Sequence, residues 1–139
     1  MKEVNEDYRN IVEILQQRKD DKGIYFIYSQ KEKYITYRDL YQKSLSLLYY
    51  LQKEGIQPGE EVIFQLADPY NFAISFWACI LGKIIPVPVT LGRTEGDKNK
   101  LFKVWNLLNS PHLLTSNRIK ELMVESKKQV NPAMKELLA

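Results

Sequence analysis

The residues of this chain that could take part in chemistry are few and scattered. The segment Gly92 to Lys98 precedes an expected helix and could present backbone amides to a phosphate. Its spacing matches neither the dinucleotide-binding glycine pattern nor the phosphate loop that ends in Lys-Ser/Thr. Thr115-Ser116 follows an expected strand, but Asn117 comes next instead of a glycine. We therefore interpret this pair as the start of a helix and assign a phosphate to neither segment.

The chain contains a single histidine, His112, and a single cysteine, Cys79. Neither a cluster of metal ligands nor a Cys-His couple can be built from one residue of each type with independent support. Carboxylates occur singly along the expected helices, mostly beside lysines, so no acid/base pair stands out. The sequence therefore predicts no catalytic, cofactor-binding or metal-ligating residue, and structural roles are expected for both His112 and Cys79.

Charge and composition exclude several classes of function. Lys and Arg outnumber Asp and Glu by 20 to 17, and the resulting net charge of +3 is too small and too dispersed for a nucleic-acid-binding domain. Lys98, Lys100 and Lys103 lie at helical spacing and are interpreted as a solvated helix face. The polar start of the chain lacks a secretory signal, no apolar run is long enough to span a membrane, and the lone cysteine favours a cytoplasmic setting.

The first half of the chain predicts helix, hairpin and helix. Apolar residues from Val4 to Leu15 recur at helical spacing after Asn5, a candidate cap for a helix that ends near Lys19. Two segments rich in β-branched and aromatic residues then predict a β-hairpin. Thr36, followed three positions later by Asp39, resembles a capping box, and Gly55 could close the helix in a left-handed conformation. The predicted hairpin strands are Ile24–Ser29 and Tyr34–Tyr37.

The second half predicts alternating strands and helices. Asp68 and Pro69 are expected to start a helix that runs to Leu81 between two strands, which gives a right-handed parallel βαβ unit. Pro86 and Pro88 each remove a donor from the second strand, which is therefore expected to be an edge strand or irregular. The remaining predictions are a strand at 61–66, the second strand of the unit at 84–89, a helix capped by Asp97 and stopped at 109–111, a strand at 112–115 and further helix after 116.

We therefore expect an α/β fold: a partial layered sheet with a parallel βαβ unit, an N-terminal β-hairpin, and helices packed on the sheet. The helix from Tyr70 to Leu81 is apolar at nearly every position, and we expect it to be covered on most sides.

Three segments, in this order and at this spacing, resemble the opening of the adenylate-forming (AMP-binding) ligase superfamily, which includes acyl-CoA synthetases and the adenylation domains of nonribosomal peptide synthetases. Ile35-Thr36-Tyr37-Arg38-Asp39-Leu40 is similar to its first core motif. The segment 55–62 (GIQPGEEV) resembles a Gly-Val-x-Pro-Gly-Asp-x-Val passage, and 78–89 (ACILGKIIPVPV) resembles the second core motif. Lys83 departs from the Gly or Ala common in the family, and Pro86 adds a second proline. The segment 91–116 looks most like the adenylation domains that open hybrid peptide–polyketide assembly lines.

This resemblance implies an ATP-dependent ligase that forms an acyl or aminoacyl adenylate with Mg²⁺ and then transfers the acyl group to a pantetheine thiol. Residues 1–139 would be the N-terminal part of an AMP-binding domain, ending before the phosphate loop. The chain alone would then bind no cofactor and be inactive, and its partner would be the remainder of the same polypeptide. Apolar surface exposed by the missing neighbours would allow copies of the chain to associate.

The alternative is a complete small α/β binding or interaction module that shares only the βαβ pattern. Its surfaces would bind a partner without catalysis.

Overall fold

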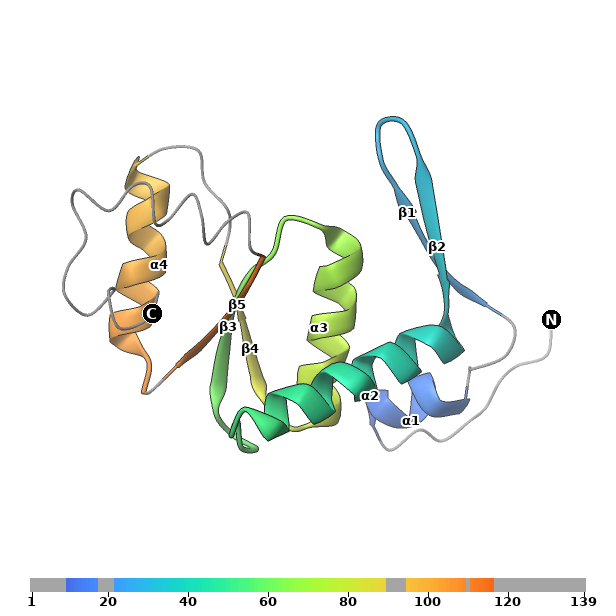
Figure 1. Ribbon diagram of the computed structural model, residues 1–139, viewed down its shortest axis with the longest axis horizontal. Coiled ribbons are helices and arrows are strands. Elements are labelled where there is room, and N and C mark those ends of the chain that lie inside the picture. Colours follow the sequence, from blue (N-terminus) through green and yellow to red (C-terminus); the bar gives the residue numbers. More distant parts are fainter. Residues whose placement is uncertain (1–9, 18–21, 90–94, 110, 117–139) are drawn as a thin grey trace.

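The protein is described by a computed structural model that defines residues 10–17, 22–89, 95–109 and 111–116 (Figure 1). Strands β1 and β2 form an antiparallel hairpin, and three further strands form a parallel sheet in the order β4-β3-β5. The predicted α/β class is confirmed, as are the hairpin and the βαβ unit. The elements are α1 (Ile11–Gln17), β1 (Gly23–Ile27), β2 (Glu32–Thr36), α2 (Tyr37–Lys53), β3 (Glu61–Gln65), α3 (Pro69–Leu81), β4 (Ile85–Pro88), α4 (Glu95–Leu107) and β5 (His112–Thr115).

Helix α1 begins at Ile11 in the part of the chain that the structure describes. The side-chain Oδ1 of Asn10 accepts the backbone N–H groups of Val12 at 3.0 Å and Glu13 at 3.1 Å. Asn10 therefore caps the described helix. The expected cap Asn5 and the expected end near Lys19 lie outside the described residues.

The hairpin leads directly into α2. Gly23 pairs with Thr36 at the base of the hairpin, and Oγ1 of Thr36 accepts the N–H of Asp39 at 3.0 Å. One residue thus ends a strand and caps a helix, which confirms the start predicted for α2. After the helix, Gly55 adopts a φ of 94°, as its predicted role requires.

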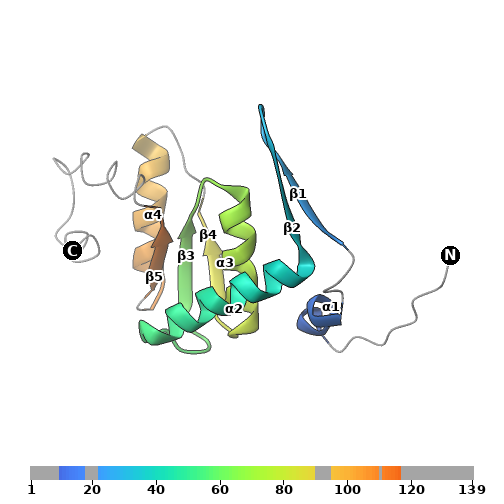
Figure 2. The same cartoon turned by 45° about the vertical axis from the view of Figure 1, so that its right-hand side comes forward.

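The core lies where α2 and α3 cover one face of the parallel sheet. Val62 and Phe64 of β3 are 1% exposed and pack with buried residues of both helices, while the Ser44 hydroxyl of α2 donates to the carbonyl of Ile74 in α3 at 3.2 Å. Figure 1 shows α2 passing below both the sheet and the hairpin, and Figure 2 shows α3 and α4 on opposite sides of the sheet. A second cluster joins α1, the hairpin and α2 through Leu15, Phe26, Ile35 and Leu40.

Strand β4 confirms that the two prolines mark an edge. The N–H of Ile85 donates to the carbonyl of Glu60, and the N–H of Val89 donates to that of Phe64, both at 2.9 Å. Because successive backbone groups along a strand point to opposite sides, Pro86 and Pro88 face away from β3. The missing donors therefore cost the sheet no hydrogen bond.

Two predictions about the helices are wrong. Only Ser75, Ala78 and Cys79 are buried in α3, since its outer side is partly open to solvent instead of covered. Asp97 does not cap α4 but lies in its first turn, because the helix begins at Glu95. The helix expected after 116 lies outside the described residues.

Lys83, in the turn between α3 and β4, has a left-handed φ of 55°. This conformation is strained for a residue with a Cβ atom. We expect Lys83→Gly to raise the free energy of unfolding by about 0.5–1 kcal/mol, the strain relieved minus the entropy cost of glycine. Urea denaturation measures the change. The control is Lys43→Gly in the exposed interior of α2, which should lower stability by about 1 kcal/mol; the same sign for both variants would contradict the prediction.

Candidate functional site

The carboxyl ends of β3 and β5 lie side by side at one end of the parallel sheet. Open α/β sheets usually bind ligands beyond the carboxyl ends of their strands. Gln65 ends β3 and Thr115 ends β5, and the two residues are paired in register. The hydroxyl of Thr115 donates to the backbone carbonyl of Gln65 at 3.1 Å. The Gln65 residue is 4% exposed, and its side-chain Oε1 is buried with no hydrogen-bond partner among the described residues.

A buried amide oxygen without a donor costs free energy, so Gln65 is the polar group of this region that structure alone brings to attention. Gln65 is not among the residues for which the sequence suggests a role. The available signal was a long polar residue at the end of a strand whose preceding residues, Val62 to Phe64, are all apolar.

Asp68 lies three residues after Gln65 and joins the tip of the hairpin to the start of α3. Its Oδ1 accepts the hydroxyl of Tyr28 at 2.5 Å and the backbone N–H of Tyr70 at 3.1 Å. The hydrogen bond to Asp68, followed by burial, raises the pKa of Tyr28 above its ordinary value of 10.0. Beside this contact, Nζ of Lys33 lies 3.5 Å from the centroid of the Tyr70 ring. Asp68 therefore caps α3, as predicted. This is the role of a structural carboxylate and not of a catalytic one.

This arrangement gives a testable prediction. Asp68→Ala should lower the free energy of unfolding by about 0.5–2 kcal/mol through loss of the cap, and should return the pKa of Tyr28 toward its ordinary value. Because the folded state holds the Tyr28 proton more tightly, the contact stabilises the wild-type protein below about pH 10, and this contribution disappears as pH rises through the raised pKa. NMR titration of the Tyr28 ring checks the shift. Tyr28→Phe is the matched control, since it keeps the cap; an unchanged Tyr28 pKa in Asp68→Ala would contradict the assignment.

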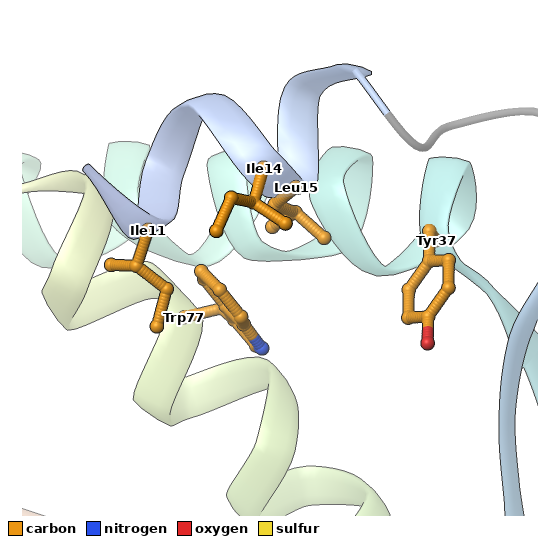
Figure 3. Close-up of a pocket in the computed structure, with 5 residues that line it drawn as sticks. All are labelled: Ile11, Ile14, Leu15, Tyr37 and Trp77. Atoms are coloured by element: carbon orange, nitrogen blue, oxygen red, sulfur yellow. The ribbon is translucent and has the colours of Figure 1, made fainter. Parts of the chain in front are cut away.

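A pocket of about 270 Å³ lies between α1, α2 and α3. It is lined by Ile11, Ile14, Leu15, Tyr37 and Trp77, and Figure 3 shows the Trp77 ring beneath α1, with Tyr37 across from it. The lining is almost wholly apolar and brings no pair of ionisable groups together. It could hold an apolar group, and its lining contains no carboxylate, imidazole or thiol.

The residues considered from sequence are not brought together. Cys79 is fully buried in the core, and burial raises the pKa of its thiol to about 11. His112 lies at the start of β5, where its Nε2 is 3.3 Å from Oε2 of Glu60. This pair joins the amino ends of β5 and β3, so it lies at the opposite end of the strands from Gln65. Of the segment 92–98, residues 92–94 lie outside the described residues, and 95–98 form the first turn of α4.

Within the ranges that the structure defines, no group of three His, Cys, Asp or Glu side chains could hold a metal ion. We assign Mg²⁺ no ligand among these residues. None of the helices in the same ranges is both long and apolar enough to cross a bilayer.

No protein-family model matches the chain. Among curated proteins, human Disco-interacting protein 2 homolog A is 32% identical over 72 residues, which cover 45% of this chain and 5% of that protein.

Solved structures match over a larger share of the chain. McyG A-PCP complexed with phenylalanyl-adenylate has a TM-score of 0.78 at 32% identity, over 91% of this chain and 25% of that one. The adenylation domain of a keto acid-selecting nonribosomal peptide synthetase module has a TM-score of 0.75 at 25% identity, over 82% and 22%. The fatty acid AMP ligase from Legionella pneumophila shares the fold, with a TM-score of 0.73 at 23% identity, over 79% and 20%.

These neighbours are adenylate-forming ligases, and they confirm the resemblance carried by the three sequence motifs. The chain has the fold of part of an adenylate-forming (AMP-binding) ligase. It spans 20% to 25% of the length of these solved structures.

Proposed function

We propose that the chain is the N-terminal scaffold part of an ATP-dependent, carboxylate-activating ligase. Such an enzyme forms an acyl or aminoacyl adenylate and then transfers the acyl group to a pantetheine thiol, in peptide or polyketide biosynthesis. The observation that carries the proposal is the match to McyG A-PCP over 91% of this chain at 32% identity. The proposed role is structural. Asp68, which follows the carboxyl end of β3, accepts hydrogen bonds from the N–H of Tyr70 and from the hydroxyl of Tyr28, so this carboxylate is already engaged in structural contacts.

On this proposal, ATP, Mg²⁺ and the carboxylic or amino acid bind to residues in the remainder of the same polypeptide, in a cytoplasmic enzyme. Parallel strands end together at one edge, so β3 and β5 would support a nucleotide pocket above their carboxyl ends. Gln65 Oε1, buried and without a partner among the described residues, would then accept a hydrogen bond from a group supplied by that remainder.

The test measures ATP–pyrophosphate exchange, which reports formation of an adenylate. The isolated chain should show only background exchange with any amino or carboxylic acid, and adenylate formation by it unaided would contradict the scaffold role. A chimera in which this chain replaces the matching quarter of McyG should retain phenylalanine-dependent exchange above background. The matched control is the same chimera with Phe64→Ala, which should lose activity with folding. A chimera that folds and binds carrier protein normally but never forms an adenylate would contradict the proposed family role.

A complete binding module remains the second candidate, and the apolar pocket between α1, α2 and α3 is the observation that favours it. Enlarging the side chain at Ile14 to Trp would fill that pocket. Under the module hypothesis, this change should abolish binding of an apolar dye to the isolated chain. Under the ligase hypothesis, the pyrophosphate exchange rate of the McyG chimera should stay within about twofold of its value without the change, because Ile14 is partly exposed and lies away from the carboxyl ends of the strands.

A further inference from the structure

The hairpin of β1 and β2 is attached to two helices of the core, each time at the start of the helix. At its base, Thr36 ends β2 and caps α2 by accepting the N–H of Asp39. At its tip, the hydroxyl of Tyr28 donates to the same oxygen of Asp68 that caps α3 by accepting the N–H of Tyr70. In both Figure 1 and Figure 2 the hairpin rises from the start of α2 and stands beside α3. The hairpin therefore connects the caps of two helices.

The contacts near the tip come from one face of the hairpin. Phe26 and Tyr28 alternate along the chain and share this face, and Lys33 is the register partner of Phe26 on β2. The Phe26 ring meets the Tyr70 ring edge-on with centroids 5.5 Å apart, and Nζ of Lys33 lies 3.5 Å from the centroid of the same ring. Both strands of the hairpin thus contact Tyr70, two residues after Asp68, so the attachment is confined to the first turn of α3.

The hairpin is structurally separate from the parallel sheet. Within the part of the chain that the structure describes, β1 and β2 pair only with each other. Phe26 and Ile35 belong to a different buried cluster from the one that joins β3 to α2 and α3. A two-stranded hairpin by itself is at best marginally stable in water, so this one depends on its contacts with the helices. Units of this kind open locally at a lower free energy than the core.

We propose that the hairpin is a strap that opens and closes on the start of α3 as one cooperative unit, and that the hydrogen bond from Tyr28 to Asp68 holds it closed. Opening removes the Tyr28 hydroxyl from Asp68 and the Phe26 ring from Tyr70, while the parallel sheet keeps its core.

The position of the contact gives the strap its consequence. Asp68 and the first turn of α3 directly follow the carboxyl end of β3, beyond which open α/β sheets usually bind ligands. The closed strap fixes the start of α3 at this end of the sheet, and the open strap releases it. The inference depends on the contacts of the hairpin and not on the proposed ligase activity.

The first experiment measures amide hydrogen exchange by NMR on the whole chain. The amides bonded across the hairpin and the amide of Tyr70 should exchange through a common opening, faster than the amides of β3. Tyr28→Phe should accelerate this group by about threefold to tenfold, the range expected for one hydrogen bond, and leave β3 unchanged. Tyr25→Phe is the matched control, because it removes the same atom from a residue that is 64% exposed and should change nothing. Equal acceleration of the β3 amides, or no difference between the two variants, would overturn the proposal.

The second experiment tests whether the strap moves as one unit. Lys33→Met keeps an unbranched side chain but removes the charge above the Tyr70 ring, and should accelerate the same amides by about twofold to fivefold. Because both substitutions act on one opening, the set of accelerated amides should match that of Tyr28→Phe. Lys43→Met in the exposed interior of α2 is the control and should leave these amides unchanged. Acceleration limited to the amides nearest Lys33 would overturn the proposal, since the hairpin would then fray and not open cooperatively.

Discussion

Replacing Phe64 with alanine should lower the free energy of unfolding by about 3–5 kcal/mol, the largest effect expected of a single substitution in this chain. Phe64 is 1% exposed in the central strand and meets the Phe72 ring edge-on, with centroids 5.7 Å apart. Its removal leaves a cavity between β3 and α3 that the rigid sheet cannot close. Total stability of a domain this size is about 5–15 kcal/mol, so the loss is a large fraction of it.

Urea denaturation followed by circular dichroism measures this change. Leu107→Ala is the control, because that side chain is 83% exposed and its loss should change stability by less than about 0.5 kcal/mol. Similar losses for both variants would show that the sheet and α3 do not form the principal core.

Gly23→Ala should disrupt the hairpin, with a loss of at least about 1–3 kcal/mol. A Cβ atom at Gly23 would lie 2.0 Å from the backbone oxygen and 2.8 Å from the backbone carbon of Ile35, neither of which can rotate away. Gly23 and Ile35 belong to paired strands, so the backbones must separate where the hairpin meets α2. The Thr36 cap would be displaced together with the strand.

Gly59 provides a contrasting control. It has a positive φ of 87°, but a Cβ atom there would meet nothing within 4 Å. Gly59→Ala should therefore cost only the strain of a left-handed residue, about 1–2 kcal/mol, and leave the hairpin intact. Chemical shifts of the β1 and β2 amides distinguish the outcomes: they should change widely in Gly23→Ala and only near the substitution in Gly59→Ala. Unchanged hairpin shifts in Gly23→Ala would contradict the close approach.

Much of the local structure could be predicted because it depends on neighbouring residues. The cap at Thr36, the helix start at Asp68-Pro69 and the closing turn at Gly55 all appear where the pattern placed them. Each is a contact between a side chain and a backbone group a few residues away, so no distant part of the chain needs to be known.

Predictions about burial were less successful. The apolar composition of α3 suggested cover on most sides, yet only Ser75, Ala78 and Cys79 are buried. Composition shows that a helix can be buried, but the neighbouring elements that are present decide whether it is. In the same way, Gln65 looks like an ordinary polar residue in sequence, and only the pairing of β3 with β5 buries its side-chain oxygen.

By itself the sequence determined the elements, their order and the resemblance to adenylate-forming ligases, because short-range hydrogen bonds, periodicity and motif spacing are properties of a linear chain. The tertiary structure decided which way the two prolines of β4 face. Prolines 86 and 88 protect β4 because the register turns them outward, while the same register leaves the backbone of Leu113 and Thr115 facing away from β3. The direction in which a strand's backbone groups point depends on its partner, and that partner is known only after the chain has folded.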